Sequence, residues 1–296
     1  RNHSSAASDV YKRQGPSGSP NKYTATNCAV SSSQTEIRCN TIPGVGSGLM
    51  WSVTVGGQGS GVLTSKTTRY ANPTVSTLSG AAADADGTAT TGGADIVLTG
   101  TNFGPANAGT SISVYYGPVS EPKKYDATAG CTVSLAHTTV TCKTVAGVGA
   151  NLKWQVEIEG QASIASSTTT KYIVPSINGL SGDAMAASGT TTYGGAAISI
   201  SGTNFGPSSH TEVAAQYGPP GSTEKYTATG CAVISQTEIT CVTAPGVGKD
   251  LRWSVTVGAQ VSTVFTSDAT AYVVPEVTDL SGCLLYTSDA ADEWLR

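Results

Sequence analysis

The chain repeats itself with a period of about 100 residues, and this repeat limits the available folds more than any other feature. Trp51, Trp154 and Trp253 mark the period, at separations of 103 and 99 residues. Each tryptophan follows two cysteines and a loop that reads P-G-V-G or A-G-V-G. Self-similarity at this spacing indicates an array of like domains. It also argues against an enzyme, because an active site is rarely built three times in one chain.

Two strings near the ends stand outside the repeat, and one DNA word read in opposite orientations encodes both. Residues 4–14 read SSAASDVYKRQ and residues 283–293 read CLLYTSDAADE. The shared word resembles a transposase adaptor from a sequencing library. We therefore predict that residues 1–14 and 283–296 are adaptor-derived and not native, and we set them aside as one does with processing scars. Residues 15–282 are then expected to be a fragment of a larger protein, with a membrane anchor possible outside it.

Proline marks each boundary between copies, and Val or Ile and then Leu-Ser-Gly follow it. Junctions that are short and proline-marked favour a semi-rigid string over freely swinging domains. The predicted units are a partial repeat at 15–72 that lacks its N-terminal strands, complete repeats at 73–174 and 175–274, and the start of a further repeat at 275–282.

Composition points to an all-β protein. Short runs rich in Val, Ile and Thr are separated by Gly and Pro, which is typical of strands and turns. The net charge is −4, and Lys and Arg do not cluster, so a nucleic-acid-binding surface is not expected.

Six of the seven cysteines form one pair in each repeat. Pairs at constant spacing favour disulfides and an oxidising compartment. Metal ligation is the competing interpretation, but a zinc site needs about four ligands, and each repeat offers two thiols without a recurrent histidine. The expected pairs are Cys28 with Cys39, Cys131 with Cys142, and Cys231 with Cys241.

Alternating apolar residues predict where the strands face. Around each cysteine pair, the pattern predicts a hairpin in which Val133 faces Val140 across the ladder. The strand after the loop alternates Leu152, Trp154 and Val156, which suits the inner face of a sandwich. Carbohydrate stacking by the tryptophan is the alternative, and the strict alternation favours the core. The expected core aromatics are Trp51, Trp154, Trp253, Phe103 and Phe205.

These motifs together resemble an IPT/TIG domain. The resemblance rests on G-G-A, then T-N-F-G-P at residues 101–105 and 203–207, then a Y-G-P turn and the cysteine hairpin. It implies an immunoglobulin-like, early-set β-sandwich over nearly all of residues 15–282. The paired cysteines are most like those of plexin-like and fibrocystin-like cell-surface proteins. The disulfides and the lack of a basic loop depart from the DNA-contacting transcription factors of the same family.

Candidate chemistry is sparse, and we expect neither catalysis, nor a cofactor, nor a metal site. A nucleophilic site needs a base, and His137 and His210 are better explained as surface residues. Asp84 and Asp86 hint at a calcium loop but lack the remaining ligands. The Gly-rich string at residues 56–61 follows a strand without a helix after it, so it indicates a hairpin turn and not a phosphate loop.

Three functions are compatible with these patterns. The leading hypothesis is a non-enzymatic structural or binding module of an extracellular or cell-surface protein, which serves adhesion, recognition or spacing and binds protein or glycan. The alternative is an accessory module of a secreted polysaccharide-active enzyme, for which Tyr115 and Tyr116 are the candidate exposed aromatic pair. An intracellular DNA-binding domain is the least favoured. All three rest on analogy at the level of the fold.

Overall fold

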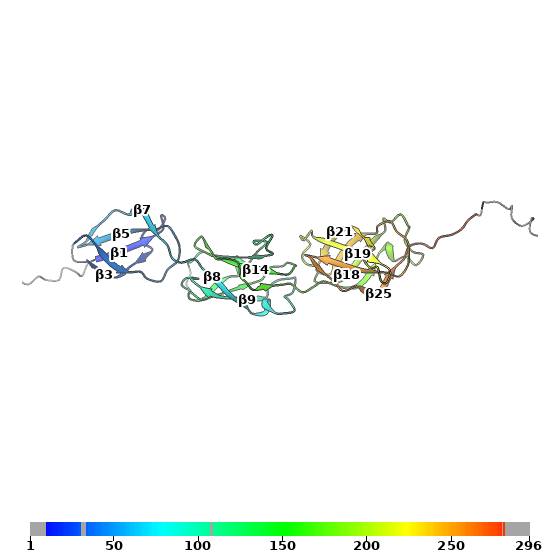
Figure 1. Cartoon of the computed structure of the whole chain (residues 1–296), viewed down its shortest axis with the longest axis horizontal. Helices are drawn as coiled ribbons and strands as arrows, with labels where there is room; N and C mark the ends of the chain where they lie inside the picture. Colours follow the sequence, from blue (N-terminus) through cyan, green and yellow to red (C-terminus); the bar gives the residue numbers. More distant parts are fainter. Residues whose placement is uncertain (1–9, 31–33, 107–108, 280, 282–296) are drawn as a thin grey trace, which may run out of the picture.

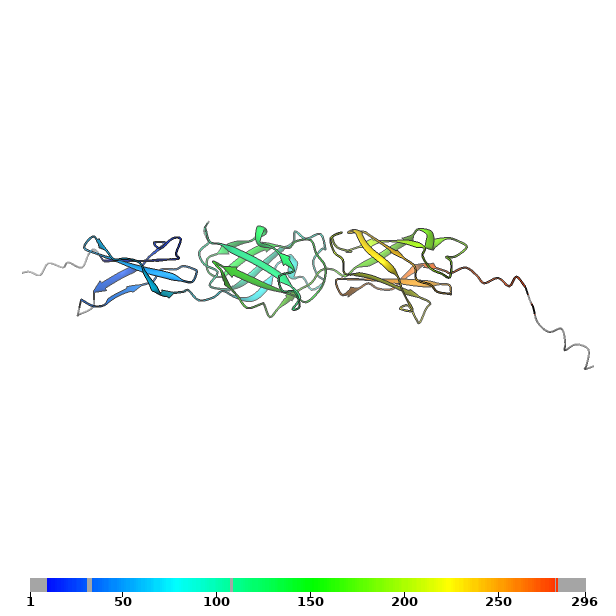
Figure 2. The same ribbon diagram turned by 90° about the horizontal axis from the view of Figure 1, so that it is seen from above.

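A computed structural model describes residues 10–30, 34–106, 109–279 and 281. These residues form three β-sandwich units that follow one another along a line (Figures 1 and 2). Of the predicted adaptor-derived segments, residues 1–9 and all of 283–296 lie outside the described residues, as does Gly282 at the end of the predicted further repeat. In the part of the chain that the structure describes, no helix is both long and apolar enough to cross a membrane.

The second unit shows the complete architecture. One antiparallel sheet has the order β12-β13-β9-β8, and the other has the order β11-β10-β14-β15, with β16 also paired to β14. Apolar residues alternate along β14 with the pattern buried, half-buried, buried, so one face lies inside the sandwich. Its elements are β8 (Thr74–Ser79), the 3-10 turn η1 (Ala81–Ala83), β9 (Asp95–Thr101), β10 (Ile112–Gly117), β11 (Tyr125–Asp126), η2 (Thr128–Gly130), β12 (Thr132–Leu135), β13 (Thr139–Lys143), β14 (Leu152–Ile158), β15 (Gln161–Ala162) and β16 (Thr169–Thr170).

The third unit repeats this topology strand for strand. Its sheets have the orders β17-β18-β22-β21 and β20-β19-β23-β24, with β25 paired to β23. Parallel bridges Thr88↔Tyr172 and Thr190↔Tyr272 close the two units in the same way. The elements are β17 (Ser176–Ser181), η3 (Asp183–Met185), β18 (Ala197–Thr203), β19 (Val213–Gly218), β20 (Tyr226–Thr227), β21 (Thr229–Ser235), β22 (Glu238–Val242), β23 (Leu251–Val257), β24 (Gln260–Val261) and β25 (Phe265–Thr270).

The first unit has one full sheet and a two-stranded remnant of the other. Its order is β2-β1-β5-β6 with β7 beside β5, while β3 pairs only with β4. Counterparts of β8 and β9 are missing from the described part of this unit. The elements are β1 (Val10–Gly15), β2 (Tyr23–Thr24), β3 (Thr26–Val30), β4 (Ile37–Asn40), β5 (Leu49–Val55), β6 (Gln58–Gly59) and β7 (Leu63–Thr68).

Strand β1 includes residues that the sequence analysis sets aside. Val10–Gln14 pair with β5 where β10 pairs with β14 in the second unit. Lys12 of β1 occupies the inward position that Val114 fills in β10. Its Nζ lies 5.5 Å from the centre of the Trp51 ring. A lysine is a poor residue for the inside of a sandwich. The adaptor origin of the segment is a statement about DNA and stays a prediction.

The expected all-β, immunoglobulin-like fold is confirmed. The hairpin registers also follow the expected alternation, with Val133 opposite Val140 and Val233 opposite Ile239. Val55 and Gln58 pair across the two-residue turn Gly56-Gly57, so the Gly-rich string does form a hairpin turn. The backbone at both glycines has a positive φ, which favours glycine in such turns.

Candidate functional site

The joints between the units are built from a valine that one unit inserts into the core of the next. Val45, of the P-G-V-G loop, is 5% exposed and belongs to the core of the second unit. Val148, of the A-G-V-G loop, is 3% exposed and belongs to the core of the third unit. Each complete sandwich is therefore finished by a side chain from the unit before it. Burying one valine contributes about 1.5–3 kcal/mol.

The T-N-F-G-P turn provides the space for that valine. Gly104 and Gly206 have φ values of +84° and +83°, a region that disfavours other residues. A Cβ at Gly104 would overlap Cγ1 of Val45, and one at Gly206 would overlap Cγ1 of Val148. The glycine thus serves both the turn and the close approach of the neighbouring unit. We refer to the whole contact between two consecutive units, with this valine and glycine at its centre, as the joint.

A tyrosine fixes the valine loop from within its own unit. The hydroxyl of Tyr125 donates to the carbonyl of Val148 at 2.7 Å and accepts from its N–H at 3.0 Å. Tyr23 makes the same two contacts with Val45, at 2.9 and 3.1 Å. Burial raises the pKa of Tyr125. Two hydrogen bonds on one hydroxyl hold the loop in place, so the valine is positioned before it meets its neighbour.

A glutamine hairpin from the following unit bonds to the same loop. Gln260, at the start of β24, accepts from the N–H of Gly149 at 3.0 Å and donates to the carbonyl of Tyr172 at 2.9 Å. Gln161, at the same place in the second unit, donates to the carbonyl of Tyr70 at 2.9 Å. Gln260 is 8% exposed and Gln161 7%, so these bonds satisfy backbone groups that would otherwise be buried without partners.

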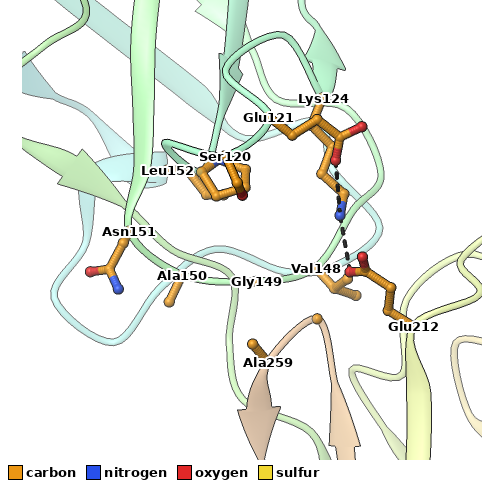
Figure 3. A pocket seen from close by; sticks show the side chains of 12 residues that line it. Ser120, Glu121, Lys124, Val148, Gly149, Ala150, Asn151, Leu152, Glu212 and Ala259 are labelled. Carbon is orange, nitrogen blue, oxygen red and sulfur yellow. Dashed lines mark hydrogen bonds and ion pairs between the residues drawn. The ribbon is translucent and has the colours of Figure 1, made fainter.

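A lysine and a carboxylate cross each joint. Lys124 lies 3.2 Å from Glu212 of the third unit and 3.5 Å from Glu121 of its own, as Figure 3 shows. Lys22 lies 3.2 Å from Glu159 of the second unit. The acid comes from the residue before β19 in one joint and from the turn after β14 in the other. Burial lowers the pKa of Lys124, but the hydrogen bond to Glu212 and the charge interactions with Tyr125, Glu212 and Glu121 together raise it by more, so the net pKa is raised.

Beside the second joint lies a crevice of about 310 Å³. Figure 3 shows Ala259 at the tip of the β23–β24 hairpin, below the strip of backbone at Gly149 and Ala150. The charged groups that line the crevice are Lys124 and the carboxylates of Glu121 and Glu212, and the rest of the lining is neutral. Within the described ranges, no three residues of His, Cys, Asp or Glu gather as a metal site would require.

His137 and His210 lie at or near the joints. Nε2 of His210 is 3.0 Å from the carbonyl of Glu212, and burial lowers the pKa of the ring. His137 is half-buried, and its backbone N–H donates to the carbonyl of Gly104 at 2.6 Å. In the third unit the position of His137 is occupied by Gln236, whose Nε2 donates to the carbonyl of Thr90 in the preceding unit at 3.2 Å.

The structure contains the disulfides Cys28–Cys39, Cys131–Cys142 and Cys231–Cys241. Trp154 and Trp253 are fully buried, as are Phe103 and Phe205. Each buried tryptophan stacks on a tyrosine at a centroid distance of 4.1 Å. The indole N–H of Trp154 donates to Thr170 at 2.9 Å, which satisfies its single donor.

Two aromatic expectations need correction. Trp51 is only half-buried, because no counterparts of β8 and β9 cover it among the described residues. It lines a groove with Val53 and Leu63 that is the uncovered inner face of this unit. Tyr116 is 1% exposed and stacks on Trp154, so Tyr115 and Tyr116 do not form an exposed pair for a glycan.

The Asp84–Asp86 segment forms a local turn. The carboxylate of Asp84 accepts from the N–H of Asp86 at 2.9 Å, a common turn for aspartate. This contact gives the calcium hypothesis no further ligand.

The joint is not predicted by the sequence motifs taken one at a time. The signals were present, since a valine recurs in the G-V-G loop and Gln58, Gln161 and Gln260 recur at one position of the repeat. Each motif by itself is typical of a turn, and nothing in the sequence paired them.

Comparison with known families places an IPT/TIG domain at residues 183–273. No curated protein matches the chain. Among solved structures, the chain is similar to a surface glycan-binding protein from a xyloglucan utilization locus in Bacteroides uniformis, with 13% identity, a TM-score of 0.25 and coverage of 68% of this chain and 49% of the other. It is similar to invasin, a bacterial integrin-binding protein, with 15% identity, a TM-score of 0.27 and coverage of 89% and 52%.

A third likeness is to the FN1–FN3 domains of chicken CNTN1, with 12% identity, a TM-score of 0.23 and coverage of 89% and 91%. The chain spans about half the length of the first two of these structures.

Proposed function

We propose that this chain is a non-enzymatic spacer and presentation segment of an extracellular or cell-surface protein. In this segment the joints keep consecutive β-sandwiches in line, so that they form a stiff rod. The observation that carries the proposal is the repeated joint, in which Val45 and Val148 complete the core of the following unit. Swinging one unit about such a joint would expose the valine and break the glutamine bonds. Free rotation therefore costs several kcal/mol at each joint.

The disulfides support the proposed compartment. Each cysteine pair closes a short hairpin with a separation of 10 or 11 residues, and such bonds persist in oxidising surroundings. The matched IPT/TIG domain is a non-catalytic module type, which agrees with a structural or binding role. Protein or glycan partners would bind the loops and faces that the rod presents.

Small-angle X-ray scattering tests the rod. The chain should scatter as one elongated particle with a narrow distribution of shapes. A matched control carries a short Gly-Ser insertion before Pro73 and another before Pro175, which leaves each unit intact but separates each valine from its socket. The control should show a broader distribution of interatomic distances. Identical scattering from the two chains would contradict the proposal.

A further inference from the structure

The end face of the third unit carries a valine that is uncovered. Val247 occupies the position of Val45 and Val148 in the repeat but is 60% exposed, against 5% and 3% for those residues. Val277, two residues after Pro275, is 76% exposed, whereas Val75, at the same distance from Pro73, is 9% exposed. Val247 lies in the loop that meets the next unit at each existing joint, and Val277 lies at the position that Val75 takes in β8, inside the following unit's own core.

The loop around Val247 is already in the docked geometry. The hydroxyl of Tyr226 donates to the carbonyl of Val247 at 2.7 Å and accepts from its N–H at 3.1 Å. Tyr125 holds the buried Val148 at 2.7 and 3.0 Å. Because the exposed and the buried loops have the same internal bonds, the end face needs no rearrangement to receive a partner, and preorganisation lowers the cost of binding.

The polar half of the joint is also present and unoccupied by a partner. Gly248 and Tyr272 correspond to Gly149 and Tyr172, whose backbone groups bond to Gln260 at the existing joint. Lys225 corresponds to the bridging lysine Lys124, and its Nζ lies 5.1 Å from the centre of the Tyr226 ring. Within the described residues, nothing takes the place of the incoming glutamine at this end.

We propose that the Val247 end face is a docking site for a further repeat of the same kind that starts at Pro275 in the same polypeptide. This repeat would place the glycine of a T-N-F-G-P turn over Val247 and bond Gly248 and Tyr272 through a glutamine hairpin. A carboxylate on either of the two positions used by Glu159 and Glu212 would pair with Lys225. The inference rests on the proposed function, because it extends the same kind of joint to the Val247 end face of the third unit.

The test extends the chain. Pro275 to Gly282 corresponds in sequence to Pro175 to Gly182, so a copy of residues 183–282 placed after Gly282, instead of residues 283–296, supplies a complete fourth repeat. Hydrogen exchange at the Gly248 N–H is then compared with the unextended chain. We expect exchange to slow about 10- to 100-fold, which corresponds to one or two buried hydrogen bonds, and to approach the rate of the Gly149 N–H.

The matched control is the extended chain with the change equivalent to Gln260→Ala in the added copy. It should lose most of the protection at Gly248 while the added sheets remain protected. A second extension that uses residues 81–182 after Gly282 guards against a poorly folding first copy. If an added repeat folds and Gly248 still exchanges at the unextended rate, or if neither added repeat folds, the docking proposal is wrong.

The outcome is separable from the rod proposal. Exchange at Gly149 and the scattering of the unextended chain depend only on the existing joints. If the Gly248 N–H of the extended chain is not protected from exchange while the Gly149 N–H is, only the end-face docking is rejected. Loss of protection at both would reject the spacer function as well.

Discussion

Replacing Val148 with alanine should destabilise the third unit, although the residue belongs to a loop of the second. The side chain is 3% exposed and packs in the cluster that contains Trp253 and Phe205. Val→Ala removes two methyl groups, worth about 0.8 kcal/mol each, with an added cost for the cavity. We therefore expect the third unit to lose about 2 kcal/mol of unfolding free energy.

The assay is denaturant-dependent hydrogen exchange resolved by unit. In Val148→Ala, amides around Trp253 should exchange faster by about 30-fold, as 2 kcal/mol requires, and those around Trp154 should change little. The control is Val247→Ala, the same loop position at 60% exposure, which should cost less than about 0.5 kcal/mol. If the loss falls on the second unit, or if the two substitutions cost the same, the joint does not complete the core.

Three further outcomes are expected. Replacing Cys131 and Cys142 together with serine should cost the second unit about 3 kcal/mol on the chain-entropy model, read from its urea midpoint against the unchanged third unit. Burial raises the pKa of Tyr116 to about 12, above the value of about 10 in an unfolded chain. The folded form then binds the extra proton, so the contribution of Tyr116 to stability should be complete below pH 10 and be lost by about 1.4 kcal/mol per pH unit as the pH rises to about 12, and Tyr116→Phe should make the urea midpoint less sensitive to pH in that window. Lys124→Glu should weaken the second joint by at most about 1 kcal/mol, because the pair is partly exposed. Glu212→Lys should restore it in a double-mutant cycle measured by exchange at Gly149, and an effect that the reversal does not rescue would assign Lys124 a packing role.

Much of the fold could be predicted from the residues, because its determinants are local. The hairpin register follows from two constraints on the same few residues, namely the cysteine pair and the inward alternation of Val133 and Val140. The burial of Trp154 follows from its period-two neighbours. The same rule places Tyr116 inside, since Ile112, Val114 and Tyr116 alternate along β10; the Tyr115–Tyr116 doublet, taken as an isolated pair, does not show this.

The joint could not be predicted in this way. Val148 and Gly206 are distant in sequence, and each sits in a motif with a sufficient local explanation. Gly206 adopts a positive φ, which accounts for glycine without any neighbouring unit. The half-burial of Trp51 was also beyond local reasoning, since it depends on which strands cover it and not on its own strand.

The closed hairpins limit how far a stretched chain can lengthen. Figure 1 shows the polypeptide entering each unit at one end and leaving at the other, so a pull on the two ends passes through every unit in series. Cys131–Cys142 removes a segment of separation 11 from the length that an unfolded unit can release. At about 3.5 Å per extended residue this segment would span about 39 Å. The bridge itself spans 4.0 Å between the two Cα atoms, so the unit releases about 35 Å less. The redox state of the surroundings would then set the reach of an overextended array without altering its relaxed length.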